Sequence, residues 1–209
     1  MLLPLVRRSV AAILNVPDIQ RLATAIGALA LAAPFAFAQT STWVSDPNHS
    51  EVDFAITHMS ISKVHGRFGG VAAAIQYDSS DIAKSSVQVT IDVTTVDTGV
   101  QSRDADLKSA HYFDVTDFPK ATFTSTNVTK SGSDLSVTGN LTLHGVTKPV
   151  VLNVEGPTPP ITDSRNRVHR GFSATTTISR TAFGIAPSAP AAMLGDEVQL
   201  TIEVDAIKQ

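Results

Sequence analysis

The chain of 209 residues contains no cysteine. A disulfide framework, a thiol nucleophile, a thiolate metal site and covalent haem attachment are therefore excluded. Without cross-links, the fold must be stabilised by a packed apolar interior. Aromatic residues are also scarce, at 6% of the chain, so that interior is mainly aliphatic.

Catalytic motifs are missing as well. The chain has no Gly-x-Ser-x-Gly nucleophile elbow, no His-Glu-x-x-His pair and no glycine-rich phosphate loop with its lysine. The formal net charge is −3 and there is no run of lysine and arginine, so nucleic acid is not expected as a partner. These absences favour a binding protein over an enzyme.

Residues 1–38 are predicted to be a signal peptide. Arg7, Arg8 and Arg21 precede an apolar run at residues 22–33, and Ala36-Phe37-Ala38 supplies the small residues that signal peptidase reads. The run is shorter than the roughly 20 residues of a membrane span, although a retained anchor remains an alternative. Cleavage after Ala38 leaves one exported domain, residues 39–209, with no membrane span; Sec and twin-arginine export both stay open.

Alternation of apolar and polar residues dominates that domain. In residues 85–96, Val87, Val89 and Ile91 alternate with polar residues, which is the period of a strand with one wet face. Eight such segments are predicted to be strands: 51–57, 64–77, 85–96, 121–130, 134–143, 148–155, 172–178 and 197–206.

Short links join nearly all of these strands, so the sheet is expected to be antiparallel. Closure into a barrel removes both edges, which predicts an all-β fold with an eight-stranded antiparallel barrel. A barrel of this size is either filled by side chains or holds one small ligand. Modest inward residues such as Val87, Val93 and Ala174 favour spare room in the lumen. A two-sheet sandwich without a cavity remains the alternative.

Residues 102–123 interrupt the alternation. Charged residues are followed by aromatic rings and Pro119, which predicts a short helix and an irregular lid over one end of the barrel. Ser102 is predicted to cap the helix with Asp104 in its first turn. Arg103 either bonds to carbonyls that close the barrel end or meets a polar head group.

Six histidines are scattered along the chain, and none is paired at the spacing of metal ligands. A rim cluster of His58, His65, His111 and His144 is conceivable, but turn-capping or surface roles are favoured. No metal and no cofactor are predicted.

The order of these features resembles the YceI-like family of bacterial proteins with a lipocalin-like barrel. The resemblance extends over about the whole of the domain. It rests on Trp43, Asp46, His49-Ser50, Phe54, His58, Gly66, Phe68, Arg103-Asp104, Leu107, Phe113-Asp114, Pro119, Phe123, Gly139, Leu141, Leu143-His144-Gly145-Val146-Thr147, Arg180 and Phe183-Gly184.

This resemblance implies a periplasmic protein that holds a polyisoprenoid or fatty-acyl amphiphile in the barrel without chemistry, and it allows a homodimer. The lid of the family often has a histidine where this chain has Asp106, and an acidic residue where it has Ala182. The predicted ligand-binding residues are Phe54, Ile56, His58, Phe68, Val89, Ile91, Arg103, Phe113, Phe118, Phe123, Leu141, Leu143, His144, Phe172, Ile178 and Phe183.

Two other functions stay open at this point. One is a lipocalin-like isomerase or cyclase that uses His58, His144 and Arg103 at the mouth. The other is a filled, ligand-free barrel that serves as an accessory or interaction module. The volume of the lumen distinguishes the ligand-free module from both the lipid carrier and the isomerase or cyclase.

Overall fold

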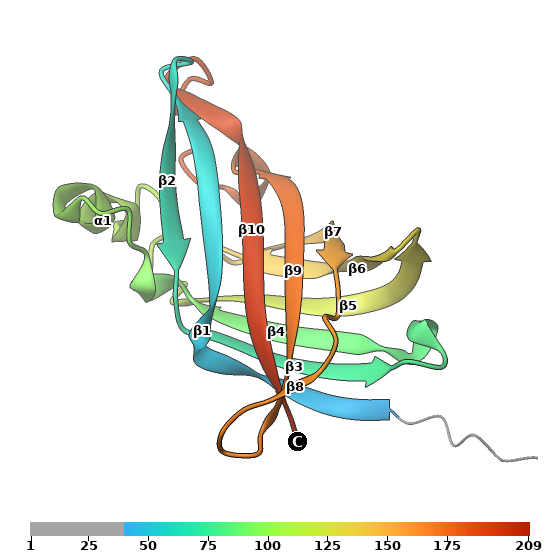
Figure 1. Cartoon of the computed structure of the whole chain (residues 1–209). Helices are drawn as coiled ribbons and strands as arrows, with labels where there is room; N and C mark the ends of the chain where they lie inside the picture. The colour runs from blue at the N-terminus through green and yellow to red at the C-terminus, as the bar shows by residue number, and fades with distance from the viewer. Residues whose placement is uncertain (1–39) are drawn as a thin grey trace, which may run out of the picture. The chain divides into compact units, whose positions relative to one another are not determined.

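The structure is a computed structural model that describes residues 40–209 (Figure 1). The predicted signal peptide lies outside these residues. The elements are β1 (Thr40–His58), β2 (Ser62–Phe68), β3 (Val71–Asp78), β4 (Ser86–Asp92), α1 (Gln101–Lys108), β5 (Lys120–Ser131), β6 (Asp134–Leu143), β7 (Val146–Glu155), β8 (Ile161–Thr162), β9 (Val168–Ser179) and β10 (Leu194–Lys208), with short 3-10 turns at Ile82–Lys84, Val93–Thr95 and Thr181–Phe183.

The strands close into a ring. Hydrogen-bonded neighbours follow the order β10-β1-β3-β4-β5-β6-β7-β9, and β9 pairs with β10 to complete it. The predicted closed barrel of eight antiparallel strands is thereby confirmed, and the two-sheet sandwich was wrong. β2 pairs with β1 and β8 with β9 outside the ring. In Figure 1, β9, β10 and the second half of β1 run steeply across the direction of β3 to β6, whereas the first half of β1 runs along β3.

Residues 64–77, predicted as one strand, form two. β2 ends at Phe68 and β3 begins at Val71. Gly70 between them has a φ of +61°, a left-handed conformation that glycine adopts without steric cost. β2 pairs with residues 52–58 of β1, whereas β3 pairs with residues 40–44. Gly69 and Gly70 therefore separate β2, which lies outside the ring, from β3, which is one of its strands.

Several strand ends also differ from the prediction, including those of β1 and β4. β1 begins at Thr40 instead of residue 51, and its register against β10 shifts between Ser45 and Ser50. This irregularity interrupts the alternation of apolar and polar residues, so the sequence pattern does not reveal the first half of the strand. β4 ends at Asp92, whose side chain accepts a hydrogen bond of 3.0 Å from the Thr94 amide and starts the 3-10 turn.

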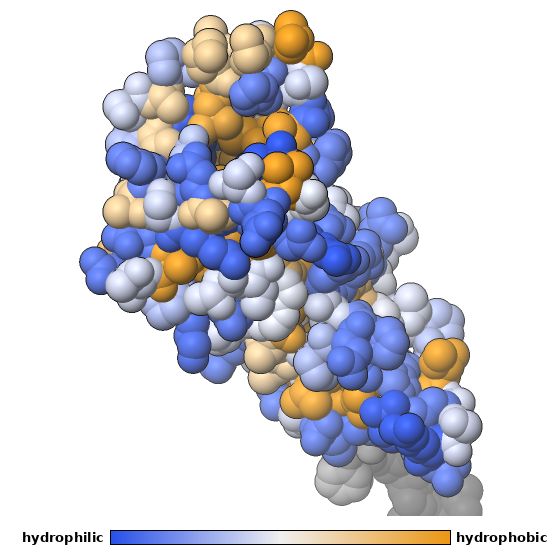
Figure 2. All heavy atoms as spheres, turned by 90° about the vertical axis from the view of Figure 1, so that its left-hand side faces the viewer, coloured by the Kyte–Doolittle hydropathy of each residue, from blue (hydrophilic) through white to orange (hydrophobic). Residues whose placement is uncertain are grey.

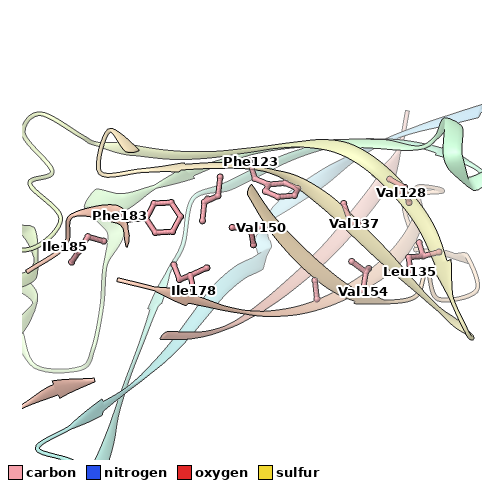
Figure 3. Close-up of a cluster of buried hydrophobic side chains, with 11 residues drawn as sticks. Phe123, Val128, Leu135, Val137, Val150, Val154, Ile178, Phe183 and Ile185 are labelled. Carbon is pink, nitrogen blue, oxygen red and sulfur yellow. The ribbon is translucent and has the colours of Figure 1, made fainter. Parts of the chain in front are cut away.

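The core lies inside the ring. Inward side chains are mostly valine, isoleucine, leucine and alanine, with outward polar residues between them, as period-two alternation requires. Figure 3 shows one part of this core, with side chains from β5, β6, β7 and β9 pointing toward one another. The buried members of that part are Phe123, Val128, Leu135, Val137, Leu141, Val150, Val154, Ala174, Ile178, Phe183 and Ile185.

The lid contains the predicted helix, but Ser102 does not cap it. α1 begins at Gln101, and Val100 is the N-cap without a side-chain hydrogen bond. Asp104 lies in the first turn, as predicted, and accepts hydrogen bonds from the Thr98 amide and hydroxyl. Within residues 40–209, no helix combines the length and apolar character that a membrane span needs.

Asp78 is fully buried where β3 ends. Its carboxylate accepts hydrogen bonds from the Ser80 hydroxyl at 2.6 Å, the Asp81 amide at 2.9 Å and the Thr40 hydroxyl at 3.2 Å. The Ser80 hydroxyl and these other donors favour the charged form and lower the pKa of Asp78 to about 2. The ionised carboxylate therefore stabilises the turn after β3.

Because the folded-state pKa lies below the ordinary value of 3.8, this stabilisation is present above that value and is lost as the pH falls toward about 2. We expect the stability difference between the wild type and Asp78→Asn to be largest near about pH 6 and to shrink steadily on acidification. Urea unfolding followed by circular dichroism measures it. A difference that stays constant with pH would contradict this account.

Gly139 of β6 is required by a neighbouring ring. A Cβ added there would lie 2.3 Å from Phe123 Cζ and 2.6 Å from the Thr124 carbonyl oxygen. Gly139→Ala is expected to destabilise the fold by about 1–3 kcal/mol through overpacking. Gly69→Ala is the matched control, because nothing lies within 4 Å of its added Cβ. Equal effects of the two substitutions on thermal unfolding would show that the close approach has no cost.

Candidate functional site

Two cavities lie inside the barrel. The first, here called the lid-side cavity, has a volume of about 120 Å³ and an apolar surface. It is open on one side and extends under the lid. Its wall comprises Val52, Phe54, Ile56, Phe68, Ile91, Val93, Leu107, Tyr112, Phe113, Ala121, Leu141, Leu143, Ile178, Arg180, Ile185, Leu194, Val198 and Leu200.

The second, called the far-end cavity, has a volume of about 90 Å³ and an almost wholly apolar surface. It lies further along the same strands, toward the end away from the lid. Its wall comprises Ala73, Ile75, Tyr77, Ser85, Ser86, Val87, Val89, Val128, Leu135, Val137, Leu152, Val154, Phe172, Ala174, Ile202 and Val204.

Phe123 separates the two cavities. It pairs with Val89, which lines the far-end cavity, and with Leu141, which lines the lid-side cavity. Its ring covers Gly139, and it is 5% exposed while lining neither cavity. Figure 3 shows Phe123 and Val150 between Ile178, on the lid side, and Val137. The lumen therefore consists of two chambers with an aromatic partition.

The lid covers the first cavity with apolar side chains. Leu107 of α1 and Phe113 after it both line the wall, and the Phe113 amide donates a hydrogen bond to the Leu107 carbonyl at 3.0 Å. Phe113 meets Phe68 edge-on, with ring centroids 5.4 Å apart. Seen from the side of α1 and β2, Figure 2 shows apolar atoms within a hollow in the upper part of the molecule.

Arg180 closes the opposite side of the mouth. It is 3% exposed, and its guanidinium donates hydrogen bonds to five carbonyl oxygens, those of Ile185, Ala186, Ala189, Leu194 and Gly195. The cation is thereby satisfied, and only its apolar stem faces the cavity. The loop after β9 is therefore held around this one side chain.

Ten of the predicted ligand-binding residues line a cavity. Strand alternation could also have identified Val198 and Leu200, which the prediction omitted. The ten comprise eight that line the lid-side cavity, Phe54, Ile56, Phe68, Ile91, Phe113, Leu141, Leu143 and Ile178. The remaining two, Val89 and Phe172, line the far-end cavity.

The other six line neither cavity. His58 is exposed at the end of β1. Phe118 packs edge-on against His144 at 4.8 Å between ring centroids, because the His144 turn approaches the lid. His144 Nδ1 bonds to the Phe183 carbonyl at 3.2 Å, and Phe183 is buried. Phe123 forms the partition described above.

Arg103 is the sixth of these. Its Nε and Nη2 donate hydrogen bonds to the hydroxyl and the carbonyl oxygen of Thr98, at 2.8 and 3.0 Å. The guanidinium therefore fixes α1 to the preceding loop. Two roles were predicted for Arg103, a structural one and contact with a polar head group, and these hydrogen bonds correspond to the structural role.

Among residues 40–209, the one group of three donors spaced for a cation comprises Asp46, His49 and Asp205, with ligand atoms within 4.8 Å of one another. It differs from the histidine rim considered above. Asp205 accepts a hydrogen bond from His169 Nδ1 at 2.7 Å, which raises the pKa of His169 in spite of its burial. Asp163 lies 3.3 Å from His169 Nε2. These contacts connect β9 to β10 and to the loop that precedes β9, at the far end of the barrel.

Comparison with known proteins gives a consistent result. A sequence model of the YceI-like domain matches residues 43–206. The chain is 37% identical over 190 residues to a UPF0312 protein of Pectobacterium carotovorum, covering 89% of this chain and 95% of that one. The YceI protein of Campylobacter jejuni has a TM-score of 0.65 and 32% identity, covering 73% of this chain and 90% of that one.

A more distant structure has the same fold. It is a polyisoprenoid binding domain from Saccharophagus degradans implicated in plant cell wall breakdown. The TM-score is 0.57 at 16% identity, and the likeness covers 82% of this chain and all of that one. At this identity, the likeness shows a common fold and nothing finer.

Loss of the Arg180 guanidinium should be costly, because it leaves several buried carbonyl groups without donors. Arg180→Ala is expected to lower the free energy of unfolding by at least about 3 kcal/mol. Arg67→Ala is the control: its side chain is 59% exposed and forms two ion pairs at 3.7 and 3.4 Å, worth at most about 1 kcal/mol. Urea unfolding compares the two, and similar losses would mean that Arg180 does not hold the loop.

Proposed function

Because the chain belongs to the YceI-like family, we propose that it is an exported protein that holds a long amphiphile in its barrel. The ligand class is a polyisoprenoid or a fatty-acyl compound. The signal peptide predicted at residues 1–38 supports export to the periplasm, where such a protein would carry or store lipid. The name of the S. degradans neighbour supports the polyisoprenoid as one candidate.

The observation that carries the proposal is the apolar surface of the lid-side cavity. Burial of an apolar chain contributes about 0.8 kcal/mol per CH₂ group. About ten buried carbons would therefore give roughly 8 kcal/mol before the cost of ordering the chain, enough for binding without any hydrogen bond. A cavity without polar groups selects ligands by their apolar character and shape.

The geometry favours binding over catalysis. Proton transfer requires an acid or base within hydrogen-bond reach of the substrate, yet neither His58 nor His144 lines a cavity. The guanidinium of Arg180 is occupied by carbonyl oxygens. A carrier is therefore a better explanation than an isomerase or cyclase, and the open lumen makes a filled accessory module less suitable.

Mass spectrometry of the protein purified from its native host tests this function. We expect a co-purifying isoprenoid or fatty-acyl compound, released on denaturation. Val198→Trp should expel it, because Val198 lines the lid-side cavity and an indole would fill that space. Val151→Trp is the matched control, since Val151 lies on β7 and is 48% exposed.

A wild-type protein that is always empty and takes up neither isoprenoid nor acyl probes would refute the proposal. Equal lipid content in the two tryptophan variants would refute the location of the ligand. Turnover of the bound lipid, lost in His144→Ala while binding persists, would favour an enzyme instead.

A further inference from the structure

An arginine points into the far end of the barrel. Arg170 of β9 lies opposite Ala206 of β10. Side chains two residues apart on a strand share a face, so Arg170 is on the same face as Phe172 and Ala174, which line the far-end cavity. A cation therefore lies beside an apolar chamber.

Two aromatic rings hold this guanidinium. Its central carbon lies 5.4 Å from the ring centroids of both Trp43 and Tyr77. Tyr77 also lines the far-end cavity, so Arg170 lies next to a residue of the cavity wall. Cation–π contacts fix the position of the guanidinium but provide no hydrogen-bond acceptor for its N–H groups.

Within the part of the chain that the structure describes, Arg170 lacks a polar partner. Its Nε is buried and has no hydrogen-bond acceptor. Arg170 takes part in none of the ion pairs of residues 40–209. Asp205, beside Ala206 on β10, is bonded to His169 instead.

Arg180 shows that such an unsatisfied state is not imposed by the barrel. It follows the other end of β9 and is fully buried, whereas Arg170 is half-buried, yet Arg180 donates to five carbonyl oxygens. Buried polar groups in proteins are nearly always hydrogen-bonded. The contrast indicates that the buried Nε of Arg170 awaits an acceptor from outside the protein.

We propose that Arg170 and the far-end cavity form a second ligand site, which takes an anionic amphiphile. The apolar part of the ligand lies among the wall residues, and its carboxylate or phosphate accepts hydrogen bonds from the Arg170 guanidinium. The planar fork of arginine fits both anions. This site works whether or not the lid-side cavity holds a lipid, so it goes beyond the proposed function.

Trp43 offers a direct readout, because it is the only tryptophan of the chain and touches the Arg170 guanidinium. Decanoate, decyl phosphate and decanol are titrated below their micelle concentrations, with Trp43 fluorescence and calorimetry as readouts. We expect both anions to bind at least about tenfold more tightly than decanol and to change the Trp43 emission. The tighter of the two identifies a fatty carboxylate or a lipid phosphate as the natural head group.

Arg170→Met keeps an apolar stem of similar length and removes the charge. It should abolish the tenfold preference for anions while leaving the affinity for decanol unchanged. Arg167→Met is the control at the same end, since Arg167 is paired with Asp163 at 2.8 Å, and it should keep the preference. Arg170→Lys retains the charge without the fork and should keep a reduced preference, which provides a second test if the methionine variant does not fold.

Equal affinities of the wild type for decanol and the two anions would overturn the inference, as would an anion preference that survives in Arg170→Met. Neither result bears on a lipid recovered from the native host, which would still support the proposed function. Conversely, an anion preference at Arg170 in a protein that never carries lipid in the lid-side cavity would overturn the proposed function alone.

Discussion

The structure depends on the closure of its backbone hydrogen bonds into a ring. β10 pairs with β9 on one side and with β1 on the other, and a pairing of β7 with β9 over residues 153–155 completes the ring, so each of the eight strands has two neighbours. Closure also forces every second side chain inward. A shared interior exists only because this ring is complete.

What the interior contains follows from the size of the inward residues. Eight strands enclose a space that side chains can just fill, and here valine and alanine occupy many inward positions, leaving two cavities. The large ring of Phe123 fills the space between them, which the absence of a side chain at Gly139 makes available. One aromatic residue thus divides a lumen that aliphatic residues leave open.

Alternation made most of this fold predictable, because it depends only on neighbouring residues. It yielded the closed barrel, and ten of the predicted ligand-binding residues line a cavity. The predicted strand 172–178 stopped short of Arg170, which the structure includes in β9, and nothing local tells which inward arginine has acceptors. For Arg180 they come from a loop after β9, and the roles of His144 and Arg103 likewise depend on turns whose geometry the pattern does not encode.

The carbonyl groups gathered by Arg180 have a mechanical consequence. Residues 185–195 are held through several hydrogen bonds to one rigid, planar group, so this side of the mouth can open only if several bonds break together. On the other side, the polar side-chain contacts of Arg103 and Asp104 go to Thr98, and Leu107 contributes apolar packing. The loop after β9 is therefore held by one buried side chain, whereas α1 is held by one residue of the preceding loop and by apolar packing.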